Sequence, residues 1–123
     1  MNQEEFSKLS KSNKTLYYAE YKGYTISETG EVFGPSGYKL QLIPKDYNGI
    51  IYYEFSINNN HPSVINITRS SVRVHRFQAF NKYRENIFEP GIAVRHLNGN
   101  SLDNSWDNIE IGTFSDNMMD VSI

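Results

Sequence analysis

The feature that most constrains the fold is a polar loop enclosed by two short apolar strands in the last third of the sequence. Ile92-Ala93-Val94 begins a strand that is predicted to end near His96, and Ile109-Glu110-Ile111 alternates as a second strand. Between them, Asn98-Gly99-Asn100 favours a tight turn that opens a polar loop running through Asn108. A strand, a polar loop and a second strand are therefore predicted in this order.

Helices are predicted on both sides of this unit. Thr113 can cap a final helix, with Asp116 three residues on in the arrangement of a capping box. Before the unit, Ser70-Ser71 are good N-cap candidates, and apolar residues then recur at helical spacing. An amphipathic helix is therefore expected over Val72–Lys82.

The first half of the chain favours β structure. A short helix is expected over Glu4–Asn13, and β signals run from Tyr17 to Thr68. The expected strands are Tyr24–Ser27, Glu31–Phe33, Lys39–Ile43, Ile50–Ile57 and Val64–Thr68, with turns or loops between them. The predicted class is α+β, with an N-terminal antiparallel sheet over residues 1–68 and a helix followed by the strand–loop–strand–helix unit over residues 69–123.

Composition excludes several classes of protein. The chain has no Cys, so any metal must be held by oxygen or imidazole ligands. No apolar run approaches the roughly 20 residues that span a membrane, and the polar N-terminus lacks the apolar stretch of a signal peptide. A cytoplasmic protein that does not bind membranes is therefore expected.

The charge is unevenly distributed although the net charge is only −2. Residues 69–95 contain six basic and two acidic residues, whereas residues 96–123 contain five acidic residues and no Lys or Arg. A basic block beside an acidic one suits a site that holds both a phosphate and a cation. On charge alone, two ordinary solvated faces would explain the same pattern.

Two stretches resemble the His-Asn-His (HNH) endonucleases of phages and introns. VHRFQAFNKY (Val74–Tyr83) resembles the helix that precedes the nuclease motif, and VRHLNGNSLDNSWDNIEIGTFSDN (Val94–Asn117) resembles the motif itself. Upstream, GYTISETGEVF (Gly23–Phe33) is similar to a β segment found before the nuclease in homing endonucleases. The resemblance implies a strand–strand–helix finger, the ββα-metal fold, and a phage or mobile-element origin.

The resemblance also implies roles for individual residues. His96 matches the general base that activates water, and Asn108 matches the middle Asn that ties the loop together and orients that His. Asn117, 21 residues after His96, matches the metal ligand on the helix. The chemistry agrees, because neutral imidazole accepts a proton near neutral pH and oxygen ligands suit Mg²⁺ or Mn²⁺.

Arg95 departs from the family pattern. Many members carry an Asp immediately before the catalytic His as a second metal ligand, and Arg95 occupies that position. We expect Arg95 to weaken metal binding by the protein alone, or to contact phosphate instead.

The remaining candidates surround these residues. Arg69, Arg73 and Arg76 are predicted to contact DNA phosphates, although a solvated helix edge would give the same spacing. His75 is expected to be a packed or supporting residue, and Asn104 to be structural.

The sequence therefore predicts a divalent-metal-dependent endonuclease that acts on double-stranded DNA. One motif per chain suits a monomer. The alternative is a DNA-binding module that keeps the HNH fold without catalysis, which Arg95 favours.

Overall fold

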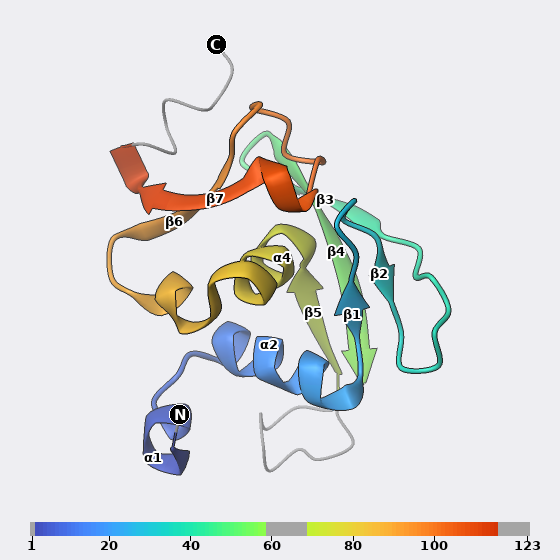
Figure 1. Ribbon diagram of the computed structural model, residues 1–123, viewed down its shortest axis with the longest axis vertical. Helices are drawn as coiled ribbons and strands as arrows, with labels where there is room; N and C mark the ends of the chain where they lie inside the picture. The colour runs from blue at the N-terminus through green and yellow to red at the C-terminus, as the bar shows by residue number, and fades with distance from the viewer. Residues whose placement is uncertain (1, 59–68, 116–123) are drawn as a thin grey trace.

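The chain begins with two helices, in the computed structural model that describes residues 2–58 and 69–115 (Figure 1). Helix α1 spans Gln3–Ser7 and helix α2 spans Lys11–Lys22. Ser10 caps α2, because its side chain accepts a hydrogen bond from the backbone N–H of Asn13 at 3.2 Å. At the other end, Gly23 adopts φ +101°, the left-handed conformation that commonly ends a helix.

The prediction that β structure starts at Tyr17 is wrong, as is that of one helix over Glu4–Asn13. Residues Thr15, Leu16, Tyr18 and Ala19 are buried together along one side of α2. This spacing matches a helix face rather than an alternating strand. The tyrosines raised the β propensity of the segment, and packing of this face against the core overrides it.

A small hairpin follows α2, as the sequence predicts. Strand β1 (Thr25–Ile26) pairs antiparallel with β2 (Val32–Phe33), with Ile26 opposite Val32. Its turn closes where the N–H of Gly30 donates to the carbonyl of Ser27 at 3.0 Å. Val32 is fully buried, so the hairpin is anchored in the core rather than free at the surface.

The larger sheet is antiparallel, with the strand order β3–β4–β5. Its strands are β3 (Ile43–Tyr47), β4 (Ile50–Asn58) and β5 (Arg69–Arg73). One predicted strand differs from these. The strand expected over Lys39–Ile43 begins only at Ile43, and Lys39 forms an isolated bridge to Phe33. The strand expected over Val64–Thr68 lies outside the described residues.

Ser70 and Ser71 lie in β5 and do not cap a helix, contrary to the prediction. They pair with Ile57 and Ser56 of β4, which satisfies their backbone groups within the sheet. Helix α4 begins later, at Val74, and runs to Tyr83, with Arg73 at the N-cap position and no capping hydrogen bond from its side chain. The hydroxyl-rich dipeptide resembles a cap locally, but pairing with β4 decides its structure.

The C-terminal unit has the predicted order. After the 3₁₀ turn η1 (Arg84–Phe88), strand β6 (Ile92–His96) pairs antiparallel with β7 (Ile109–Thr113), and the 3₁₀ turn η2 (Trp106–Asn108) precedes β7. Strand β7 extends two residues beyond the predicted Ile111. Residues 114 and 115 are helical and follow Thr113 directly, whereas Asp116 lies outside the described residues.

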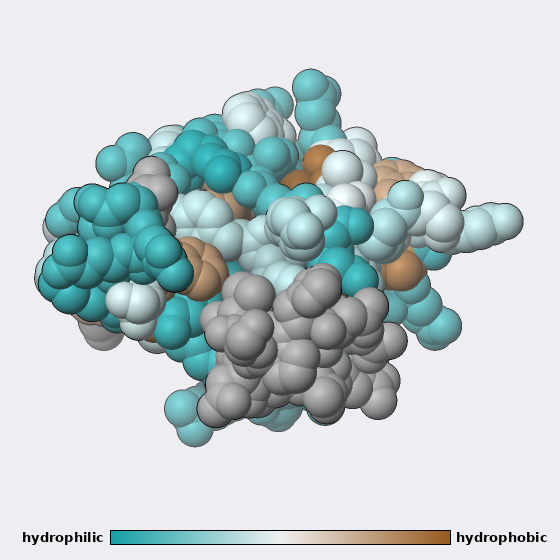
Figure 2. Space-filling view, turned by 90° about the horizontal axis from the view of Figure 1, so that it is seen from below, coloured by the Kyte–Doolittle hydropathy of each residue, from teal (hydrophilic) through white to brown (hydrophobic). Residues whose placement is uncertain are grey.

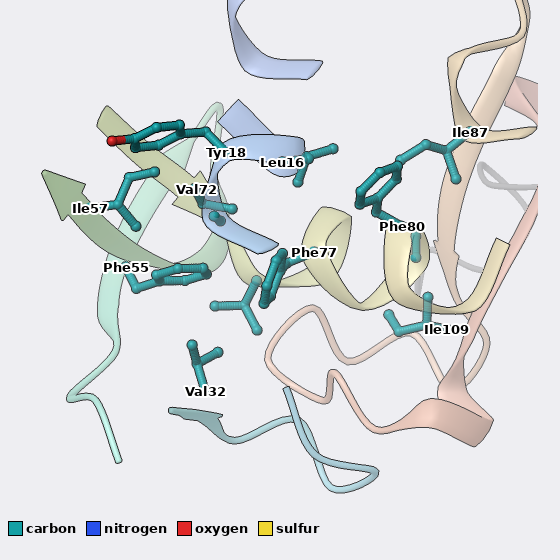
Figure 3. Close-up of a cluster of buried hydrophobic side chains, with 13 residues drawn as sticks. Leu16, Tyr18, Val32, Phe55, Ile57, Val72, Phe77, Phe80, Ile87 and Ile109 are labelled. Carbon is teal, nitrogen blue, oxygen red and sulfur yellow. The ribbon is translucent and has the colours of Figure 1, made fainter. Parts of the chain in front are cut away.

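Helix α4 is the centre of the fold. In Figure 1 it lies between α2 on one side and the β6–β7 ribbon on the other, with β4 and β5 beside it. One hydrophobic cluster contains residues from every layer, and Figure 3 shows Phe77 and Phe80 of α4 inside it. The class is α+β, as predicted, and residues from both halves of the chain share this core.

Outside the residues drawn in grey, the face shown in Figure 2 is mostly hydrophilic, with apolar residues in small separate spots. Among the described helices, none is long and apolar enough to cross a membrane.

Phe80 tests whether α4 is the centre of stability. Its side chain is fully buried and contacts Tyr17 edge to face, with ring centroids 4.8 Å apart. Phe80→Ala is expected to lower the free energy of unfolding by about 3–5 kcal/mol, measured by urea denaturation. The control Tyr21→Ala removes a ring that is 77% exposed and should change it by about 0.5 kcal/mol or less. Similar losses in both variants would contradict this account of the core.

Candidate functional site

His96 lies at the end of β6 and turns inward. It pairs across the ribbon with Ile109, which is fully buried, and the His96 residue itself is only 8% exposed. The side chain reaches the loop that follows, where its Nε2 lies 2.9 Å from Oδ1 of Asn104. Asn104 is also buried, at 3% exposure, so this hydrogen bond is shielded from water.

This hydrogen bond determines the chemical form of His96. An amide oxygen can only accept, so Nε2 must carry the proton and donate it to Asn104, which leaves Nδ1 as the basic nitrogen. Burial lowers the pKa of the His96 imidazole below its usual 6.5, although the hydrogen bond to Asn104 and the charge of Asp103 oppose the change. His96 is therefore neutral at physiological pH, with a defined nitrogen able to accept a proton.

Asn108 closes the polar loop on itself. Its Oδ1 accepts from the backbone N–H of Asn98 at 2.9 Å, and its Nδ2 donates to the carbonyl of Asp103 at 2.8 Å. Its own carbonyl accepts from the N–H of Leu97 at 3.0 Å. Asn108 thus bonds to Leu97, which follows His96, and to Asp103, which precedes Asn104. It therefore fixes both ends of the segment that joins His96 to Asn104.

Asp103 is used by the loop as a structural acceptor. Its carboxylate accepts from the Ser105 hydroxyl at 2.7 Å and from the Asn98 amide at 2.8 Å. The hydrogen bond from the Ser105 side chain is the largest cause that lowers the pKa of this carboxyl. Asp103 is therefore ionised at neutral pH, and its charge lies close enough to raise the pKa of His96.

His75 and Tyr52 form a wall beside His96. The ring of His75 stacks on Tyr52 with centroids 4.5 Å apart, and the His75 and His96 rings are 5.4 Å apart. His75 is buried, and its Nδ1 has no hydrogen-bond partner among the described residues. Burial first, and then the neighbouring His96 and Arg76, keep the pKa of His75 well below 6.5.

Two of the three predicted phosphate contacts meet in one surface pocket. Arg73 and Arg76 line it together with Lys45, Tyr47, Glu54, Ser12, Leu16, Ser71 and Val72. The Arg73 guanidinium lies 4.1 Å from the centre of the Tyr47 ring and 4.0 Å from the Glu54 carboxylate. Arg76 donates to the side chain of Asn13. Only the backbone of Arg69 is described, at the start of β5.

The pocket connects to His96 through aromatic rings. Tyr47 contacts Tyr52 with centroids 6.0 Å apart, and Tyr52 lies 6.1 Å from the His96 ring. A run of rings therefore leads from the Arg73 guanidinium to the imidazoles, along one face of the β3–β4 hairpin.

The remaining predicted site residues are Arg95 and Asn117. Arg95 is half-buried in β6 opposite Glu110, and alternation along the strand directs it to the face opposite His96. Asn117 lies outside the described residues. Within residues 2–58 and 69–115, no three His, Asp or Glu side chains gather as a metal site.

Gln78 and Lys82 contact the loop but were not predicted. Gln78 is fully buried and donates to the Asn104 carbonyl at 2.9 Å. The Lys82 ammonium donates to the carbonyls of Trp106 and Ile109 at 2.7 and 2.9 Å. A sequence signal did exist, because His75, Gln78 and Lys82 recur at the spacing of one helix face.

The comparisons agree with the resemblance seen in the sequence. Residues 88–119, which contain β6, the polar loop and β7, match the model of the HNH endonuclease family. This match assigns the segment to that family, and the HNH prediction is confirmed for it.

A solved structure of the HNH homing endonuclease I-HmuI, described for its DNA binding and cleavage, has a similar fold. It has a TM-score of 0.52 and 24% sequence identity, and it covers 78% of this chain. The match covers 49% of the I-HmuI chain, so this protein spans about half the length of that structure. No curated protein sequence matches the chain.

The buried imidazoles predict a loss of stability in acid. Below pH 6.5 the unfolded chain binds a proton at His75, whereas the folded protein keeps this ring neutral because its pKa is well below 6.5. The free energy of unfolding should therefore fall as pH drops from 6.5, by up to about 1.4 kcal/mol per pH unit for this ring, until the folded pKa is reached. Urea denaturation between pH 7.5 and about pH 5 measures the slope.

His75→Phe is the matched variant, because it keeps an aromatic ring against Tyr52 and removes the titrating group. It should be less sensitive to pH than the wild type, while the His96 contribution remains. An identical slope in the two proteins would mean that His75 is not buried in its neutral form.

Proposed function

We propose that the protein is a divalent-metal-dependent endonuclease that hydrolyses phosphodiester bonds of double-stranded DNA. The observation that carries the proposal is His96, buried, neutral and held in one tautomer by Asn104, within the segment that matches the HNH endonuclease family. In a nuclease, a neutral histidine with one free ring nitrogen can activate the attacking water.

His96 would act as the general base. Hydrolysis of a phosphodiester requires a nucleophilic hydroxide, and Nδ1 of the neutral ring would accept the proton of the attacking water. Asn104 would keep that nitrogen unprotonated, because it engages the other one. Asn108 would hold the loop that carries Asn104 in place.

The chemistry of the available donors fits a hard cation such as Mg²⁺ or Mn²⁺. The chain offers oxygen and imidazole groups and no thiolate, and the loop beside His96 contains the amides of Asn98, Asn104 and Asn108 and the carboxylate of Asp103. Asn117 would hold the ion, with waters and phosphate oxygens completing its shell. When bound, the ion would supply stabilisation of the negative charge on the phosphate and on the departing oxygen.

Arg73 and Arg76 would bind phosphates of the DNA away from the scissile bond. Their pocket also contains Lys45 and two serine hydroxyls, which are suitable phosphate donors, against one carboxylate, Glu54. We also propose phosphate contacts for Arg95 and for Arg69, which is the first residue of β5. Residues 1–68 would then contribute a DNA-contacting part, through pocket residues such as Ser12 and Lys45, and residues 69–123 the nuclease, acting as a monomer in the cytoplasm.

One observation favours a second function, a DNA-binding module without catalysis. Arg95 stands where many family members have an acidic ligand, and its side chain is directed to the face opposite His96. A module of this kind would bind duplex DNA and leave it intact under every metal condition.

Plasmid cleavage separates the two functions. The wild type should cut supercoiled plasmid in Mg²⁺ or Mn²⁺ and not in EDTA, and Asn117→Ala should abolish this cutting. His96→Ala should lower the single-turnover rate by about 10²–10⁴-fold with little change in DNA affinity, because a neutral ring adds little to phosphate binding. Because the pKa of His96 is lowered, the wild-type rate should rise with pH with a midpoint below 6.5.

The control is Asp107→Asn, an exposed position in the same loop, which should cut at the wild-type rate. Cutting by His96→Ala at the wild-type rate would remove His96 as the base. Binding without cleavage at saturating Mg²⁺ and Mn²⁺ would favour the non-catalytic module.

Salt dependence tests the proposed phosphate-binding arginines. DNA affinity should fall as salt rises, with a log–log slope of about −0.9 per phosphate neutralised. The double variant Arg73→Ala, Arg76→Ala should weaken binding and flatten the slope by about one unit for each arginine that binds a phosphate. The matched control Lys8→Ala, Lys39→Ala removes two exposed charges elsewhere, each next to a glutamate, and should leave the slope unchanged. Equal slopes for the two double variants would place the DNA elsewhere.

A further inference from the structure

Helix α4 presents a row of polar side chains to the polar loop between β6 and β7. His75, Gln78 and Lys82 follow one another at intervals of three and four residues, which places them on one face of the helix. The centroid of the His75 ring lies 5.4 Å from that of the His96 ring. Gln78 donates to the carbonyl of Asn104, and Lys82 donates to the carbonyls of Trp106 and Ile109.

Gln78 is the most constrained of the three. Both hydrogens of its amide nitrogen are used, because Nε2 donates to the carbonyls of Asn104 and Ser27, each at 2.9 Å. Its Oε1 accepts from the Asn81 amide at 3.3 Å. The side chain is fully buried, so water cannot replace these bonds if the amide is removed.

The turn of the β1–β2 hairpin also contacts this loop. The backbone N–H of Trp106 donates to the carbonyl of Glu28 at 2.7 Å. Gly30 lies so close that a Cβ there would stand 2.9 Å from the carbonyl carbon and oxygen of Asn104, and its φ of +87° also favours glycine. The backbone at Asn104 is therefore enclosed between the hairpin turn and the Gln78 amide.

We infer that Gln78 is a positioning residue for His96, acting through Asn104. The Gln78 amide fixes the backbone of Asn104, and the Asn104 side chain then holds Nε2 of His96 and leaves Nδ1 free for the attacking water. The inference rests on the proposed function, in which His96 is the general base. Its physical basis is that small displacements of a reacting group have large effects on rate.

A purely structural role would have different consequences. Loss of packing at Gln78 would lower stability without changing which nitrogen of His96 carries the proton. Loss of positioning would let Asn104 move, and the His96 ring would then populate both neutral tautomers. The two roles can therefore be separated by observing the ring itself.

The test combines spectroscopy with kinetics on the full chain. The ¹⁵N chemical shifts of the histidine rings, recorded where the rings are neutral, distinguish the protonated nitrogen from the basic one. The variant Gln78→Met removes the donors at similar size, and Gln78→Leu removes them with a smaller apolar side chain if the first does not fold. Single-turnover cleavage and DNA affinity are measured on the same samples.

Two controls are matched to this variant. Asn81→Ala removes the bond to Oε1 and leaves both Gln78 donors in place. Ile57→Val shortens a buried side chain of β4 and reports the effect of lower stability alone. Both should retain the Nε2-protonated tautomer of His96 and the wild-type rate.

In the wild type, His96 should show a single tautomer protonated at Nε2. In Gln78→Met, or in Gln78→Leu, a mixture of tautomers should appear, and the rate should fall by about 10–100-fold with DNA affinity little changed. A folded variant that keeps the single tautomer overturns the inference, whether or not its rate falls. A wild type that never cuts DNA defeats the proposed function, whereas the tautomer measurement still decides whether Gln78 positions His96.

Discussion

The burial of α4 is the constraint on which the rest of the structure depends. A polar side chain buried on a helix at the centre of a small protein is stabilised by finding hydrogen-bond partners, because an unpaired buried group costs about 1–3 kcal/mol. Its apolar residues, such as Phe77 and Phe80, pack against α2 and the larger sheet. Its polar residues Gln78 and Lys82 both donate to carbonyls of the polar loop, so the core and the candidate site are built by opposite faces of one helix.

The same burial gives His96 its chemical character. A histidine at an exposed strand end would titrate near 6.5 and exchange its proton between two nitrogens. Here, removal from water favours the neutral ring, and a single amide oxygen selects the nitrogen that is protonated. The neutral form of His96 thus follows from where β6 ends relative to α4, and not from any unusual residue.

Local signals predicted the part of the site that is local in sequence. The Asn98-Gly99-Asn100 turn, the end of β6 at His96 and the start of β7 all depend on residues a few positions apart, and the structure has them as predicted. The failures are elements decided by distant partners. The Tyr17 region is a helix because the core covers one side of it, and Ser70-Ser71 form a strand because β4 pairs with them. The contacts of Gln78 were not predicted for the same reason, since its acceptors, the carbonyls of Ser27 and Asn104, are far from it along the chain.

Those distances have a consequence for folding. Gln78 bonds to a residue 51 positions earlier and to another 26 positions later, so its amide is fully bonded only after three separate segments have come together. Contacts that close long loops form late and slowly. A partial opening that frees the hairpin turn would therefore loosen the polar loop at Asn104 while most of the core stays packed. The arrangement of Gln78, Asn104 and His96 would then have a lower local stability than the rest of the fold.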